Sequence, residues 1–137
     1  SYGGKKVEDL NVAVKTIDFL SIHMPLNKET KNLIDINILK KMKKNTIIVN
    51  TARGGVINEI DLDKALKDKI IFGAGLDVFE KEPPDQSNPL LKNDRVLLSP
   101  HSSSFTKECK IRMGIETVQN IINFFENKSE KSMSVKL

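Results

Sequence analysis

Three residues far apart in the sequence carry side chains that could act together on a small organic acid. Arg53 presents a rigid fork of donors, which matches a carboxylate through two parallel hydrogen bonds. His101 can give or take a proton near neutral pH, and a neighbouring carboxylate such as Glu82 would fix its tautomer and favour its charged form. If these side chains converge, they could hold a carboxylate and move the proton of an adjacent hydroxyl group.

Each of the three residues follows an apolar segment whose β-branched and aliphatic composition predicts a buried strand. Carboxyl ends of parallel strands lie at one edge of a sheet, which is where open α/β sheets bind their ligands. We therefore expect Arg53, Glu82 and His101 to meet at that edge. The predicted strands are residues 17–22, 46–49, 70–78 and 95–99.

The segments between these strands have helical patterns. Asp35 is a plausible N-cap for a helix through Met42, and Asn58 for a helix that ends near Asp68. Residues 102–106, four of which carry a hydroxyl, precede a long last helix, whose apolar stripe we interpret as core or interface packing. Strands that alternate with helices predict an α/β fold: a partial doubly wound parallel sheet of Rossmann type, with helices on both faces. Residues 7–15 form a short helix at most.

The composition is that of a globular chain. It has 39% hydrophobic and 29% charged residues, and no apolar run is long enough to cross a bilayer. The net charge of +4 comes from scattered lysines without interleaved aromatic residues, so we expect no nucleic-acid partner and no membrane partner. The single cysteine, Cys109, excludes an internal disulfide and offers no metal site, which makes a cytoplasmic setting the default.

On a sheet of this type, the three residues suggest hydride transfer between a nucleotide cofactor and a hydroxy acid. Arg53 would anchor the carboxylate, His101 would handle the hydroxyl proton, and Glu82 would orient His101. Spacing leaves other interpretations open, because Arg53 could be a surface arginine and His101 could cap the following helix. Glu80 competes with Glu82, and His23, which has no partner in the pattern, is interpreted as structural.

Four segments resemble successive signatures of the D-isomer-specific 2-hydroxyacid dehydrogenases, in the same order and at similar separations. They are HMPLNKET at 23–30, NTARGGVINE at 50–59, GAGLDVFEKEP at 73–83 and LLSPHSSSFTKE at 97–108. The resemblance extends from about Glu8 to Lys128 and implies an NAD-dependent oxidoreductase. By this matching, Arg53 is the substrate-binding arginine, Glu82 the supporting glutamate and His101 the proton-donor histidine.

The same resemblance implies contacts with the nicotinamide half of NAD, with Asp77 near the carboxamide. The residues concerned are Met24, Pro25, Thr51, Ala52, Arg53, Asp77, His101 and Ser103. A carboxylate in a buried strand needs a partner or ligand of this kind, because an unpaired one is costly. The implied substrate is a small 2-hydroxy or 2-keto acid, with 3-phosphoglycerate or hydroxypyruvate and glyoxylate the favoured candidates. Relatives pair as dimers, for which the last helix and Leu33-Ile34 are candidate surfaces.

The G-x-G-x-x-G turn that binds the pyrophosphate in this family has no match in the sequence, since Gly3-Gly4 lacks the pattern. We therefore expect residues 1–127 to be a partial NAD-binding domain without its phosphate loop, ending in a long helix, and residues 128–137 to be a polar tail. Such a C-terminal part should bind NAD poorly and be inactive alone. The alternative is a non-catalytic, NAD-sensing binding or regulatory module on the same fold.

Overall fold

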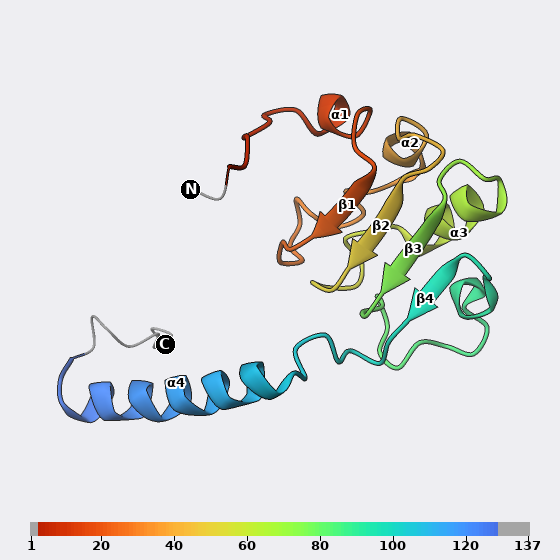
Figure 1. Ribbon diagram of the computed structural model, residues 1–137. Helices are drawn as coiled ribbons and strands as arrows, with labels where there is room; N and C mark the ends of the chain where they lie inside the picture. Colours follow the sequence, from red (N-terminus) through yellow and green to blue (C-terminus); the bar gives the residue numbers. More distant parts are fainter. Residues whose placement is uncertain (1–2, 129–137) are drawn as a thin grey trace. The chain divides into compact units, whose positions relative to one another are not determined.

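The computed structural model describes residues 3–128, and within them four strands form one parallel sheet (Figure 1). The chain divides into two compact units, one up to His101 and one from Ser102. The sheet lies in the first unit, with its strands in the order β1-β2-β3-β4. The strands are β1 Phe19–Ile22, β2 Ile47–Asn50, β3 Gly73–Leu76 and β4 Val96–Leu98. The predicted parallel sheet of Rossmann type is confirmed.

The register of the sheet aligns the carboxyl ends of all four strands. Ile22, Asn50, Leu76 and Leu98 are paired across neighbouring strands. The loops that follow these residues therefore emerge at one edge, where the predicted chemical groups are expected. A carboxyl edge shared by four strands is the condition for residues distant in sequence to form one site.

Five helices accompany the sheet in residues 3–128. They are α1 Leu10–Ala13, α2 Ile36–Leu39, α3 Glu59–Lys67, the 3-10 helix η1 Pro89–Lys92 and α4 Lys107–Phe125. Asp35 and Asn58 cap α2 and α3 as predicted, because each side chain accepts backbone N–H groups of the first turn. Thr106 caps α4, so the alternative interpretation of His101 as that cap is wrong. Within the described part of the chain, no helix is sufficiently long and apolar to pass through a bilayer.

Helix α2 is shorter than predicted. The backbone N–H of Lys41 bonds to Ile38 at 3.0 Å and that of Met42 to Leu39 at 3.1 Å, so the chain tightens to three-residue spacing. The predicted extension to Met42 is therefore wrong as α-helix, although the Met42 side chain is buried as its apolar character requires.

Strand β3 begins at Gly73 and not at residue 70 because the end of α3 occupies the intervening residues. Lys69 has φ 56°, its N–H bonds to Leu66 at 3.1 Å, and the N–H of Ile70 bonds to Ala65 at 2.8 Å. This is a Schellman motif with a left-handed lysine at the position that glycine usually takes. Ile70 thus closes the helix before the strand starts.

One hydrophobic core lies between the sheet and the helices of the first unit. Ile48 and Leu76 project into it, together with Leu39 of α2 and Leu62 and Leu66 of α3. Side chains alternate along a strand, so the neighbours of Ile48 and Leu76 project from the other face.

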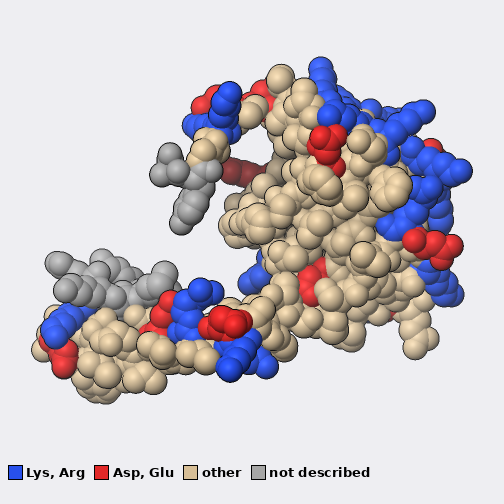
Figure 2. Space-filling view, in the orientation of Figure 1, with Lys and Arg blue, Asp and Glu red and all other residues tan. Residues whose placement is uncertain are grey.

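The second face of the sheet is exposed. Phe19 of β1 is 71% exposed and Leu97 of β4 is 81% exposed, so the expectation that these strands are buried on both faces is wrong for these two side chains. Both belong to edge strands, and the core helices of this unit lie on the opposite face. Figure 2 shows a broad area with few charged side chains over the strands, with Lys and Arg gathered mainly along its border.

Two further expectations concern surfaces. Of the suggested dimer surface Leu33-Ile34, the Ile34 side chain is buried and pairs with Ile57 in an isolated bridge, so that side chain cannot take part, while the place of Leu33 stays a prediction. The predicted long helix is confirmed as α4, whose apolar residues such as Ile115 and Phe125 are exposed in the second unit. Of the predicted tail, residues 129–137 lie outside the described residues.

Candidate active site

The predicted site residues follow the four strands at the carboxyl edge of the sheet. Met24 follows β1, Arg53 follows β2, Asp77 follows β3, and His101 follows β4. Glu82 lies farther along the connection after β3. Because the strand ends are in register, this edge gathers residues that are up to 77 positions apart, from Met24 to His101.

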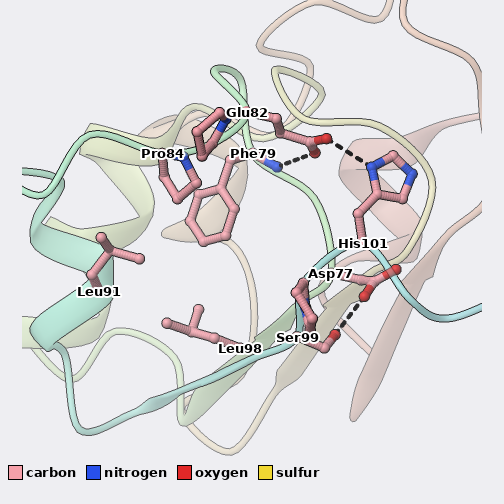
Figure 3. A pocket seen from close by; sticks show the side chains of 10 residues that line it. Asp77, Phe79, Glu82, Pro84, Leu91, Leu98, Ser99 and His101 are labelled. Atoms are coloured by element: carbon pink, nitrogen blue, oxygen red, sulfur yellow. Dashed lines mark hydrogen bonds and ion pairs between the residues drawn. The ribbon is translucent and has the colours of Figure 1, made fainter.

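The structure joins Glu82 to His101. The Oε2 atom of Glu82 lies 2.7 Å from Nδ1 of His101, and its Oε1 atom accepts the backbone N–H of Phe79 at 3.0 Å (Figure 3). The hydrogen bond with His101, the bond from Phe79 and the positive charges of His101 and Arg53 together hold the pKa of Glu82 below its usual value, although partial burial opposes them. Glu82 is therefore a carboxylate that fixes one nitrogen of the imidazole ring.

Glu80 has different partners. Its carboxylate lies 3.3 Å from Nζ of Lys31, and both side chains are half exposed. Sequence spacing alone did not distinguish Glu80 from Glu82 as the partner of His101. In the structure, only Glu82 of these two acids contacts His101.

The backbone at His101 is unusual. His101 has φ 51°, in the left-handed region, directly after Pro100. Histidine tolerates this region better than most non-glycine residues, and such conformations are concentrated at functional sites. The preceding Ser99 continues the pairing of β4, since its N–H bonds to Leu76 at 3.0 Å. The imidazole is thus placed by a strained residue at the end of a paired strand.

Arg53 lies in a turn that Asn50 holds. The buried amide of Asn50 donates to the carbonyl of Arg53 at 2.9 Å and accepts the N–H of Ala52 at 3.1 Å. The guanidinium donates to the Ala52 carbonyl at 2.6 Å, and within residues 3–128 no hydrogen bond or ion pair joins it to Glu82 or His101. Its positive charge is the smallest of the influences that lower the pKa of Glu82.

The loops after β2 and β3 are packed against each other at a glycine. A Cβ atom on Gly54 would lie 1.9 Å from the backbone carbon of Phe79 and 2.3 Å from the nitrogen of Glu80. Gly55 has φ 79°, a conformation that side chains disfavour. The Gly-Gly pair therefore lets the Arg53 turn approach the backbone that leads to Glu82.

Two hollows of the first unit contain the predicted residues. One, of about 440 Å³, has mainly apolar walls that include Phe79, Pro84, Leu91 and Leu98, with Asp77, Glu82, Ser99 and His101 as polar members (Figure 3). The other, of about 480 Å³, is lined by His23, Met24, Pro25, Leu26, Thr51, Ala52 and Arg53. Ser103 belongs to the second unit, so its contact with a cofactor stays a prediction.

Asp77 is only 3% exposed, and its Oδ1 atom accepts the hydroxyl of Ser99 at 2.5 Å. A buried carboxylate at a mainly apolar hollow suits an amide that donates hydrogen bonds, such as the carboxamide of nicotinamide. The carboxylate of Asp77, as an acceptor, therefore fits the carboxamide of the expected cofactor at this position.

Three polar residues of the site have roles that the sequence did not reveal. Asn50 holds the Arg53 turn, Ser99 binds Asp77, and Ser21 pairs with the exposed His23, its Oγ atom 2.7 Å from Nε2. A polar residue that ends an otherwise apolar strand is the signal that could have identified Asn50 and Ser99.

Comparison with protein families gives a match over most of the chain. The sequence model described as "D-isomer specific 2-hydroxyacid dehydrogenase, NAD binding domain" matches residues 1–103. A glyoxylate reductase of Thermofilum pendens is 47% identical over 114 residues, which are 83% of this chain and 34% of that protein. A D-3-phosphoglycerate dehydrogenase of Methanocaldococcus jannaschii is 44% identical over 121 residues, 88% of this chain and 23% of that protein.

Comparison with solved structures gives matches in the same family. An NAD-complexed D-isomer specific 2-hydroxyacid dehydrogenase from Lactobacillus delbrueckii ssp. bulgaricus superposes with a TM-score of 0.79 at 30% identity, covering 87% of this chain and 40% of that chain. The chain spans between 23% and 40% of the length of the curated relatives compared with it.

Proposed function

Because the chain belongs to the D-isomer-specific 2-hydroxyacid dehydrogenase family, we propose that it takes part in the interconversion of a D-2-hydroxy acid and its 2-keto acid with NAD. The observation that supports this most directly is the 2.7 Å contact between His101 and Glu82 at the carboxyl edge of the sheet. A 2-keto acid requires a cation for its carboxylate and a proton donor for its carbonyl oxygen, and Arg53 and the Glu82-oriented His101 are groups of these two kinds.

Each residue has a defined task in this proposal. The guanidinium of Arg53 binds the substrate carboxylate and so positions the adjacent carbonyl. Glu82 holds Nδ1 of His101, which directs the other nitrogen, Nε2, toward the substrate. In reduction, His101 gives a proton from Nε2 to the carbonyl oxygen, and in oxidation it removes that proton from the hydroxyl. NAD, when bound, supplies or accepts the hydride.

The favoured substrates are 3-phosphoglycerate, hydroxypyruvate and glyoxylate. Relatives that are more than 40% identical to this chain over the aligned residues are named glyoxylate reductase, D-3-phosphoglycerate dehydrogenase and hydroxypyruvate reductase. We further propose a cytoplasmic protein that works as a homodimer. Exposed apolar residues on α4 support such an assembly, because they give that helix a surface suited to a partner.

The 137-residue chain alone should bind NAD weakly and show no turnover. No G-x-G-x-x-G turn is found in its sequence, and that turn supplies the backbone donors for the pyrophosphate in dinucleotide-binding folds. The alternative is a binding or regulatory module on the same fold, which senses NAD without catalysis.

Loss of NADH absorbance with a panel of 2-keto acids tests these alternatives. The assay compares the product of the complete reading frame, the 137-residue chain and a His101→Ala variant of the complete protein. Turnover by the complete protein, abolished by the His101 change, would support the dehydrogenase. NADH binding by a folded complete protein without turnover of any acid would support the regulatory module instead.

A further inference from the structure

One carboxylate outside the proposed catalytic groups holds the loop that carries Glu82 at two points. Oε1 of Glu59 accepts the backbone N–H of Glu80 at 2.6 Å, and Oε2 accepts the side-chain amide of Asn88 at 2.7 Å. Glu59 is the first residue of α3, so both contacts tie an irregular loop to a regular helix. Charge-assisted hydrogen bonds of this length are among the stronger polar contacts in proteins.

The first contact is next to the one that orients Glu82. Phe79 donates its N–H to Glu82, and the following residue, Glu80, donates its N–H to Glu59. Two consecutive backbone donors are thus held by two carboxylates, one from α3 and one from the loop itself. The peptide between them is also the one against which Gly54 packs. Movement of this peptide would shift the anchor from which Glu82 reaches His101.

The second contact holds the far end of the loop through Asn88. The Oδ1 atom of Asn88 caps η1 by accepting the N–H of Leu90 at 3.0 Å, while its amide donates to Glu59. Leu90 is fully buried in the core. Glu59 itself lies in the first turn of the nine-residue α3, where the helix dipole favours an acidic residue. Glu59 therefore connects two fixed elements.

We infer that Glu59 is a positioning residue of the active site, whose carboxylate holds residues 79–88 in the conformation that keeps Glu82 on Nδ1 of His101. The inference rests on the proposed function for its catalytic consequence. Glu59 acts only through the backbone of Glu80 and through Asn88, and it needs no contact with substrate or cofactor. A plain structural brace would stabilise the fold without affecting the Glu82–His101 pair, and that difference can be measured.

Glu59→Gln is the discriminating change. Glutamine has the same size but only one acceptor oxygen, so one of the two donors, the Glu80 N–H or the Asn88 amide, must face an NH₂ group. Glu80→Gln is the matched control, because it makes the same change in a neighbouring residue and removes only the half-exposed pair with Lys31. The backbone N–H of Glu80 that binds Glu59 remains in the control.

Two quantities are measured for these variants: kcat and the pKa of Glu82. In the complete protein, Glu59→Gln should lower kcat for 2-keto acid reduction about tenfold, the effect of losing one charge-assisted hydrogen bond, with the KM for NADH unchanged. In ¹³C NMR titrations of the same proteins, Glu59→Gln should raise the pKa of Glu82 toward its usual value, because the contacts that lower it are loosened. Glu80→Gln should change neither quantity.

A lowered unfolding temperature of Glu59→Gln with unchanged kcat and unchanged Glu82 titration would overturn the inference and leave Glu59 as a brace. If the wild-type protein turns over no 2-keto acid, the proposed function fails, while the NMR titration still decides the role of Glu59. If Glu59→Gln does not fold, Asn88→Ser replaces it, since serine keeps the N-cap of η1 and removes the amide donor to Glu59. It should shift kcat and the Glu82 titration in the same direction, and no shift would overturn the inference.

Discussion

At the scale of single residues, the site depends on the two carboxylate oxygens of Glu82, each of which has a different hydrogen-bond partner. One binds the imidazole at 2.7 Å and the other binds the Phe79 N–H at 3.0 Å, so the carboxylate cannot rotate without losing a partner. A carboxylate that is fixed in this way selects one orientation and one tautomer of His101. The imidazole then presents a defined nitrogen to a substrate, which is what makes proton transfer efficient.

Glu82→Gln should remove a pH-dependent part of the stability. The pKa of Glu82 is lowered in the folded protein, first by the hydrogen bond with His101 and then by the Phe79 N–H, so the ionised form favours folding. This contribution is present above the carboxyl pKa of the unfolded chain and is lost as the pH falls through the lower, folded value. Urea unfolding at about pH 7 and about pH 3 should therefore show a larger stability advantage of wild type over the variant at the higher pH. An equal difference at both pH values would contradict the pairing.

Arg53→Lys should weaken use of the 2-keto acid much more than binding of NADH in the complete protein. Lysine keeps the charge but cannot make two parallel hydrogen bonds to a carboxylate, so we expect kcat/KM for the acid to fall about 10- to 100-fold. Arg95→Lys is the matched control, because Arg95 precedes β4 at the opposite end of the strands and donates to the Phe72 carbonyl. Steady-state kinetics with both substrates varied would measure this, and equal losses for acid and NADH would argue against the assigned role.

At the scale of elements, the site depends on loops that have almost no space between them. Gly54→Ala would place its methyl group 1.9 Å from the backbone of Phe79, so the loops after β2 and β3 must separate. We expect a loss of about 3 kcal/mol in the free energy of unfolding, since backbone must move and no flexible side chain can yield. Gly114→Ala is the control: nothing lies within 4 Å of its Cβ position in α4, and alanine should favour that helix by up to about 1 kcal/mol. Denaturant titration of both variants measures the difference, and a neutral Gly54→Ala would mean that the loops are not in contact in solution.

Features governed by local chemistry were predictable from the sequence, and those governed by tertiary contacts were not. Asp35 and Asn58 predict the starts of their helices because a capping side chain accepts a hydrogen bond from the first turn that follows it. The start of β3 was not predictable, since Lys69 takes a left-handed conformation that favours glycine. The choice between Glu80 and Glu82 depends on a loop without periodicity, and the role of Asn50 depends on a turn that closes only in the folded chain.

At the scale of the whole molecule, the first unit buries one face of its sheet and exposes the other. The helices supply a core on the side of Ile48, whereas Phe19 and Leu97 have no comparable cover among residues 3–101 of the first unit. Burial of apolar side chains on the covered face should therefore supply most of the stability of this unit, and side chains of the exposed face should contribute little.

A pair of alanine substitutions on opposite faces tests this directly. Ile48 of β2 is fully buried, so Ile48→Ala should cost about 3 kcal/mol through lost burial and the cavity that remains. Leu97 of β4 pairs with Gly75 on the other face and is 81% exposed, so Leu97→Ala should change the free energy of unfolding by no more than about 0.5 kcal/mol. Urea unfolding at several protein concentrations measures both. A cost for Leu97→Ala that approaches that for Ile48→Ala would show that the Leu97 face is covered in solution, and a cost that grows with concentration would identify the cover as a second copy of the chain, since only association depends on concentration.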